Sequence, residues 1–445
     1  MQEVHPLERE LGMELYSTED PGIGGRIKVH FEDFVVQEIS SDGTTLQLTD
    51  WDTPSKVDLG LDRKTRYTLF TVQKMGLSTM DVANLLAASL KISRNFITYA
   101  GLKDKRAVTV QTMSGPARIA EDLGLLRLSR VLITDIRRSR TPVHIGDLWG
   151  NRFTIMIREI EADSETSVDI AAKVRRSTLL NYFGVQRFGV TRPTTHLIGR
   201  ALVKREFEDA IRIMVSTTSG YETPPMEKVR EALADNLQPT DDMIDVFPRE
   251  LGYERNVLKY LTRHPGRYEE AISRIPPRIQ TLFVHAYQSY LFNKLISRRV
   301  KRGLSIVSPD VGDFIIRLDE AHSGRDSWSY TTDSTLDERR EQVTRGKYGL
   351  AAPVVGYSTR MPQSTQTDFV KEILDEEGVR LMDFRNSKVR ALDSQGGLRL
   401  VSMSVPDMEV SCEDGLVRLS FNLRKGSYAT VVLRELMKND PTNRV

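Results

Sequence analysis

Apolar and polar residues alternate along the first part of the chain, a pattern that predicts strands. Residues 26–39 alternate in this way and end in β-branched side chains, which predicts one strand with a polar bulge at residues 32–33. We expect further strands at residues 65–74, 96–100, 131–136 and 153–160, and helices at residues 82–90 and 170–182. The first 180 residues therefore predict a mixed sheet, without the regular strand–helix alternation of a dinucleotide-binding fold.

The middle of the chain has helical periodicity instead. We expect helices at residues 197–215, 227–233, 255–261 and 281–300, separated by polar stretches that contain proline. Residues 319–347 are strongly charged and predict exposed irregular structure, whereas residues 398–437 return to strands and close with a helix. This order favours an α+β fold in which the two ends of the chain form one domain and the middle is inserted into it.

Length and composition indicate a soluble protein of more than one domain. The chain has 445 residues, which predicts two or three domains, and its single cysteine, Cys412, excludes an internal disulfide and a thiolate metal cluster. No apolar run approaches the roughly 20 residues of a membrane span, and the N-terminus lacks a hydrophobic signal core, so we expect a cytoplasmic protein. The net charge of +2 means that any nucleic-acid site is a local patch.

Motifs for cofactors are scarce. The glycine-rich residues 21–26 lack both the Lys-Ser/Thr ending of a phosphate loop and the spacing of a dinucleotide fingerprint. The seven histidines include no H-x-x-x-H pair, so a metal site has little support. If the chain is an enzyme, we expect it to work with side chains alone, without cofactor or metal.

The run AGLKDKRAVTVQ, residues 100–111, carries the most specific chemistry. Asp104 lies between Lys103 and the pair Lys105 and Arg106. Such cations keep a carboxylate ionised and can also hold phosphate oxygens, so the run can bring an anionic polymer to a reactive acid. The charge pattern by itself also fits a solvated turn, which is the commoner case.

Two further segments combine aromatic and polar residues. In GNRF, residues 150–153, Asn151 can bond the edge of a base and Phe153 can stack on its face, although the pattern alone favours a turn residue and a core residue. NYFGVQRFG, residues 181–189, is dense in aromatic residues and glycine. Phe34 fits the core, and Lys28 can reach an acid or a phosphate, although an exposed strand lysine is the commoner case.

Five segments in order resemble the tRNA pseudouridine synthase D family. They are EDFVVQE at residues 32–38, AGLKDKRAVTVQ at 100–111, GNRFT at 150–154, NYFGVQRFG at 181–189 and GSYATVVLREL at 426–436. Each is weak alone, but five in register are specific. The resemblance is weakest at residues 216–274, which look like a helical addition.

The resemblance implies a pseudouridine synthase mixed-sheet catalytic domain with an inserted α/β TRUD-type domain and a cleft between them. The catalytic domain would comprise residues 1–180 and 395–445, and the inserted domain residues 181–394 with the helical addition at about 216–274.

By the same resemblance Asp104 is the catalytic residue, Asn151 and Phe153 contact the base, and Lys28 and Phe34 complete the site. Most other pseudouridine synthases have tyrosine where this family has Phe153. A phenylalanine can stack but cannot take a proton, so removal of the proton from uracil C5 falls to Asp104 or water.

The implied reaction converts a uridine of tRNA, with position 13 expected, to pseudouridine. The N-glycosidic bond breaks, the uracil turns, and C5 joins C1′; Asp104 either attacks C1′ or removes the 2′ proton, and both roles remain open. We expect a monomer that binds tRNA and no membrane. The basic residues expected to line the RNA are Lys103, Lys105, Arg106, Arg187, Arg192 and Arg424. The rival classes are a non-catalytic RNA-binding protein and a methyltransferase, which would need a nucleotide-type cofactor.

Overall fold

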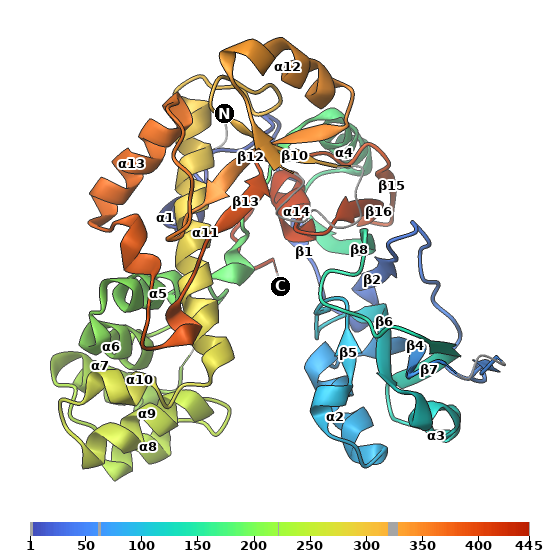
Figure 1. Cartoon of the computed structure of the whole chain (residues 1–445), viewed down its shortest axis with the longest axis horizontal. Helices are drawn as coiled ribbons and strands as arrows, with labels where there is room; N and C mark the ends of the chain where they lie inside the picture. The colour runs from blue at the N-terminus through green and yellow to red at the C-terminus, as the bar shows by residue number, and fades with distance from the viewer. Residues whose placement is uncertain (1–2, 61–63, 221, 319–327, 445) are drawn as a thin grey trace.

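One long mixed sheet forms the centre of one half of the molecule (Figure 1). The structure is a computed structural model and describes residues 3–60, 64–220, 222–318 and 328–444. The main strands lie in the order β15-β16-β8-β2-β6-β4-β7-β3, with β1 paired to β8 and β5 paired to β6. Their bounds are β1 Gly24–Arg26, β2 Phe34–Ile39, β3 Val57–Asp58, β4 Tyr67–Met75, β5 Thr98–Tyr99, β6 Val108–Pro116, β7 Val131–Ser139, β8 Gly150–Ile160, β15 Glu409–Glu413 and β16 Leu416–Arg424. Since β2 runs parallel to β6 and antiparallel to β8, the sheet is mixed, as the sequence predicted.

A smaller sheet and a long helix build the other half. The smaller sheet has the order β11-β10-β12-β13, and β9 pairs separately with β14. These strands are β9 Leu179–Leu180, β10 Phe314–Arg317, β11 Trp328–Tyr330, β12 Tyr348–Val354, β13 Gly397–Leu400 and β14 Ser402–Met403. The helix α11, Pro277–Lys301, packs against α5, α13 and β12.

Helices cover the sheets and form most of one arm. Figure 1 shows two arms that meet near α14: α11 with α5 to α10 runs down one arm, and the strands around β4 and β7 with α2 and α3 form the other. The helices are α1 Pro6–Glu10, α2 Thr79–Ser89, α3 Ala120–Leu125, α4 Ser164–Arg176, α5 Thr195–Lys204, α6 Phe207–Ser216, α7 Pro224–Asp235, α8 Asp241–Val246, α9 Gly252–Arg263, α10 Tyr268–Ile272, α12 Leu336–Thr344, α13 Thr365–Glu377 and α14 Ala429–Met437. None of the helices in the described ranges is long and apolar enough to span a membrane.

The single strand predicted for residues 26–39 is wrong. Strand β1 ends at Arg26, Lys28 adopts a left-handed backbone with φ of 58°, and a short 3-10 turn precedes β2. Asp33 stabilises this turn, because its carboxylate accepts a hydrogen bond from the backbone N–H of His30 at 2.7 Å and binds Arg158 at 2.8 Å. The break matters for the site, because it leaves the Lys28 side chain beside Asp104.

Three other predicted elements also differ from the structure. The predicted helix 197–215 is two helices, α5 and α6, because Arg205 turns the chain with φ of 62°. The helix predicted at 170–182 starts at Ser164 and ends at Arg176, and residues 179–180 pair with β14 instead. Of the charged stretch 319–347, residues 319–327 lie outside the described residues, and the remainder holds β11 and α12 rather than irregular structure.

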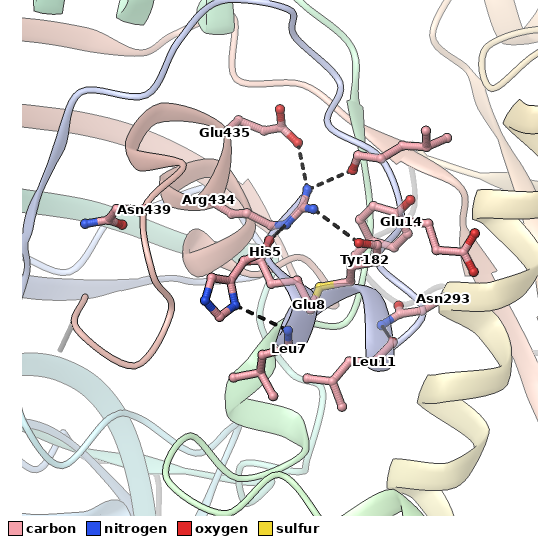
Figure 2. Close-up of polar contacts among 12 residues, drawn as sticks. His5, Leu7, Glu8, Leu11, Glu14, Tyr182, Asn293, Arg434, Glu435 and Asn439 are labelled. Atoms are coloured by element: carbon pink, nitrogen blue, oxygen red, sulfur yellow. Dashed lines mark hydrogen bonds and ion pairs between the residues drawn. The ribbon is translucent and has the colours of Figure 1, made fainter. Parts of the chain in front are cut away.

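A buried ionic network joins the two ends of the chain. Glu8 on α1 is 0 % exposed, and its two oxygens bind Arg434 at 2.8 Å and Arg444 at 2.7 Å. Figure 2 shows Arg434 reaching from α14 towards the N-terminal segment, with Glu435 and Tyr182 beside it. Burial alone would raise the pKa of Glu8, but the two guanidinium groups outweigh this effect and hold the pKa below its usual value. The network therefore fixes α14 and the loop at Tyr182 against the first residues of the chain.

Candidate active site

Asp104 lies on a loop, residues 101–106, which follows β5 and precedes β6; we call it the Asp104 loop. Its start is fixed by two buried side chains. The amide nitrogen of Gln111 donates to the carbonyl of Gly101 at 3.1 Å, and the Thr79 hydroxyl accepts the backbone N–H of Lys103 at 2.9 Å. Thr79 also donates to Gln111 at 2.8 Å, so strand β6 and helix α2 hold the loop together.

Lys103 fixes the loop to the sheet and does not face solvent. Its Nζ lies 2.7 Å from Oε2 of Glu38 on β2, and the two residues are 7 % and 1 % exposed. The other carboxylate oxygen of Glu38 accepts the backbone N–H of Thr112 at 3.0 Å. A buried pair of this kind is not available to bind phosphate, so the predicted RNA contact of Lys103 is replaced by a positioning role.

Lys74, at the end of β4, binds the backbone of Asp104 itself. Its Nζ donates to the carbonyl of Asp104 at 2.8 Å and to the carbonyl of Leu77 at 2.6 Å, and the side chain is 0 % exposed. Burial lowers the pKa of Lys74 to about 8, although the nearby Asp104 charge acts in the opposite direction. Sequence reasoning missed this residue; the signal was a lysine at an inward-facing position of a strand, two residues after the buried Val72.

The carboxylate of Asp104 is accessible but paired. Its Oδ1 lies 3.1 Å from Nζ of Lys28, and the two side chains are 39 % and 5 % exposed. The same Nζ lies 4.1 Å from the ring centroid of Phe34, which is a cation–π arrangement. The structure thus brings together three of the predicted residues, Asp104, Lys28 and Phe34. The Asp104 carboxylate faces solvent, and the Lys28 ammonium is buried behind it.

Asn151 and Phe153 lie on β8, on the same face as Glu38 and Val36 of β2. Phe153 is 7 % exposed and packs against Phe34 and Phe421, with ring centroids 6.0 Å and 5.7 Å apart. In this conformation both phenylalanines therefore belong to the core, as the simpler interpretation of their pattern required.

The amide of Asn151, unlike the two phenylalanines, is not explained by core packing. Its Oδ1 is buried and accepts no hydrogen bond from any residue the structure describes. An unsatisfied buried acceptor costs about 1–3 kcal/mol, so a hydrogen-bond donor from a ligand would stabilise this oxygen.

The remaining predicted cations are dispersed. Lys105 is exposed and lies 4.0 Å from Asp81, and Arg106 is also exposed. Arg187 donates to the Ser289 hydroxyl at 3.2 Å on α11. Arg192 forms an ion pair at 2.5 Å with Glu254, which is 0 % exposed, within the helical arm. Since that pair stabilises the helices, we do not retain Arg192 as an RNA contact.

Arg424 and a residue that sequence reasoning missed, Arg399, line a cavity of about 420 Å³ between the ends of the two sheets. Arg424 lies over the ring of Trp149, 5.2 Å from its centroid. Arg399 donates to the side-chain oxygen of Asn181 at 2.8 Å and lies 4.0 Å from the ring centroid of Phe183. Burial lowers the pKa of Arg399 to about 10. Trp149, which also lines this cavity, directly precedes β8 and is two positions from Asn151 in the chain.

No group of three or more His, Cys, Asp or Glu side chains in the described ranges is placed to hold a metal ion. The polar groups around Asp104 are ammonium, amide and hydroxyl groups, which can position an acid and bind a base or a phosphate.

Comparison with known proteins places the whole chain in one family. The family model for tRNA pseudouridine synthase D (TruD) matches residues 10–436. A relative from Methanosarcina acetivorans, named "Probable tRNA pseudouridine synthase D", is 34% identical over 99% of this chain and 98% of its own length. A relative of the same name from Thermococcus onnurineus is 32% identical over 95% of this chain and 97% of its own length.

A solved structure agrees with these sequence matches. The crystal structure described as TruD of Methanosarcina mazei superposes with a TM-score of 0.77 at 30% identity, covering 99% of this chain and 100% of the other. The chain therefore belongs to the tRNA pseudouridine synthase D family, as the five sequence segments indicated.

Proposed function

We propose that this chain is an isomerase that converts a uridine of tRNA to pseudouridine, with position 13 as its target. The observation that carries the proposal is the geometry of Asp104, whose loop is held by four polar contacts while its carboxylate, paired with Lys28, remains accessible to solvent. Effective catalysis requires a reactive group whose position is fixed before the substrate arrives. Membership of the family supports the same reaction.

The catalytic step needs the Asp104 carboxylate about 3–3.5 Å from its target atom. If Asp104 attacks C1′, the N1–C1′ bond breaks as the carboxylate–C1′ bond forms, and C5 of the turned uracil then displaces the carboxylate from C1′. If Asp104 instead removes the 2′ proton, the N1–C1′ bond breaks to leave a glycal, and C2′ takes back a proton as C5 of the turned uracil bonds to C1′. The proton on C5 leaves and N1 gains one, so nothing is oxidised and no group is transferred. The buried Lys28 ammonium stabilises the negative charge of the Asp104 carboxylate before the substrate binds.

Asn151 and Phe153 receive the uracil in this proposal. The unpartnered Oδ1 of Asn151 accepts the N3–H of uracil, which satisfies a buried acceptor and selects a base with a donor at that position. Stacking on Phe153 requires its ring to move from its contacts with Phe34 and Phe421; it then contributes about 1–3 kcal/mol and offsets part of the few kcal/mol needed to extrude the nucleotide. Phe153 cannot take the C5 proton, which leaves Asp104 or water as the acceptor.

The phosphate backbone of the RNA binds cations near the site. We assign this role to the exposed Lys105 and Arg106 and to the half-buried Arg187 and Arg424, while Lys103 positions the loop. Residues 1–180 and 395–445 form the catalytic domain of the proposal, with the inserted domain between them and the helices at about 216–274 as an addition. The enzyme acts as a cytoplasmic monomer.

The substitution Asp104→Asn tests the proposal, because a half-exposed side chain can lose its charge without unfolding the protein. Purified wild-type protein should release tritium from tRNA labelled at uridine C5, with no additive, and the variant should bind tRNA equally but release none. Near-normal release by the variant would refute the assignment of Asp104. A wild-type protein that binds tRNA but releases nothing would instead support the non-catalytic alternative, and release only with a methyl donor would support a methyltransferase.

A further inference from the structure

Leu102 is a large apolar residue that the Asp104 loop holds in solvent. It is 70 % exposed, whereas Lys103 beside it is 7 % exposed. Single exposed apolar residues are common on protein surfaces, so exposure alone says little. Two further observations distinguish Leu102: its backbone is fixed on both sides, and a second exposed apolar residue lies on an adjoining loop.

The backbone on both sides of Leu102 is tied to the scaffold. The carbonyl of Gly101 accepts a hydrogen bond from Gln111, and the N–H of Lys103 donates to Thr79. The Lys103 ammonium is also held by Glu38 at 2.7 Å. Leu102 therefore cannot withdraw its side chain from water through a small movement of the loop, which means that the fold presents it there.

Ile145 is the second exposed apolar residue and is 76 % exposed. Its loop joins the Asp104 loop, because the N–H of Gly146 donates to the carbonyl of Ala100 at 2.8 Å. The ammonium of Lys425 donates to the carbonyl of Gly146 at 3.0 Å, which adds a cation to the same rim. A rim that combines apolar side chains with a cation matches the chemistry of stacked bases and their phosphates.

We propose that Leu102 is a wedge that enters the base stack of the RNA as the target uridine leaves it. The inference rests on the proposed isomerase function, which requires an extruded uridine. Extrusion leaves a gap in the stack and costs a few kcal/mol, and proteins that distort nucleic acids insert apolar side chains into such gaps. Because Leu102 is two residues from Asp104, their Cα atoms are at most about 7 Å apart, so the wedge and the reactive carboxylate act on the same nucleotide position.

The test compares Leu102→Ala with Leu102→Met and with the control Leu125→Ala. Leu125 is 79 % exposed at the end of α3, which packs on β7 and β3, so it reports the loss of an exposed leucine elsewhere. Single-turnover formation of pseudouridine is measured with saturating enzyme on two substrates: the native tRNA, and a tRNA in which the nucleotide facing the target is changed so that the target cannot pair. Melting temperatures of the variants confirm that each is folded.

We expect Leu102→Ala to slow the reaction on native tRNA at least tenfold, and the loss to shrink to less than threefold when the target is unpaired, because extrusion is then easier. Leu102→Met should stay within threefold of wild type, and Leu125→Ala should not differ. If Leu102→Ala loses the same factor in rate on both substrates, or loses none on native tRNA, the proposal that Leu102 acts as a wedge is refuted. If wild-type protein forms no pseudouridine at all, the proposed function fails instead, and the two failures are thus distinct.

Discussion

Replacing Lys74 with methionine removes the ammonium that binds the backbone of Asp104 and keeps a side chain of similar length. Two effects on the free energy of unfolding oppose each other. Burial lowers the pKa of Lys74 from 10.5 to about 8, a difference that corresponds to about 3 kcal/mol, and methionine relieves this cost of burying a charge. Against it, the carbonyls of Asp104 and Leu77 lose their donor, at about 1–3 kcal/mol each. We therefore expect the net change in stability at pH 7 to lie between a gain of about 1 kcal/mol and a loss of about 3 kcal/mol.

Activity should fall much further than stability. Without Lys74 the carbonyl of Asp104 loses its hydrogen bond, and the carboxylate is then less closely fixed relative to the sugar. A misplacement of about 1 Å can cost about 100-fold in rate. We expect kcat for tritium release from tRNA to fall by about 10- to 100-fold with little change in KM, because Lys74 is buried and does not touch the RNA.

The assay combines urea unfolding with steady-state kinetics, and Lys259→Met, at an exposed position on α9, is the control for loss of a lysine. The pH dependence gives a second readout. Above pH 8 native Lys74 has lost its proton, whereas the unfolded chain keeps it up to about 10.5, so the stability of wild type relative to the variant should rise from pH 8 to 9.5. Normal kcat in Lys74→Met, or a stability loss large enough to explain the lost activity, would refute the reasoning.

Three further predictions follow from other buried groups. Phe153→Leu keeps an apolar core but removes the stacking face, so we expect kcat per folded molecule to fall at least tenfold while the melting temperature moves little; unchanged kcat would make Phe153 only a core residue. Glu8→Gln leaves Arg444 without its buried carboxylate and Arg434 with Glu435 alone, and it should cost about 3–5 kcal/mol in urea unfolding; a loss below about 1 kcal/mol contradicts this. Burial lowers the pKa of His196 from 6.5 to about 4. Between these two pH values the histidine is protonated in the unfolded chain but neutral in the native state. Stability should therefore fall between pH 6.5 and 4, by less in His196→Gln than in wild type, and equal losses would contradict the assignment.

The sequence predicted the mixed sheet well because alternation reports which strand positions are buried. It failed at residues 26–39, where a left-handed backbone at Lys28 and the capping contacts of Asp33 interrupt an alternating pattern. It also joined α5 and α6, since the turn at Arg205 has no glycine or proline to mark it. Such breaks depend on tertiary contacts that local patterns do not contain.

The sequence singled out the residues of the candidate site but not the contacts that hold them. Asp104 stood out as the one acid in a cationic run, Lys28 was expected beside it by the family resemblance, and the structure places the two side chains 3.1 Å apart. The buried contacts of Lys74 and Arg399 join segments far apart in sequence, so spacing could not predict them. For the same reason Lys103 looked like a phosphate ligand, whereas its partner is a buried carboxylate on β2.

A crystal structure of the Asp104→Asn variant bound to tRNA tests the central claim most directly, because the substitution should stop the reaction and keeps the shape of the side chain. The account predicts that the target uridine is extruded, with its C1′ or C2′ within about 4 Å of the side chain at position 104. A complex in which the extruded nucleotide lies elsewhere, with that side chain in open solvent, would contradict it.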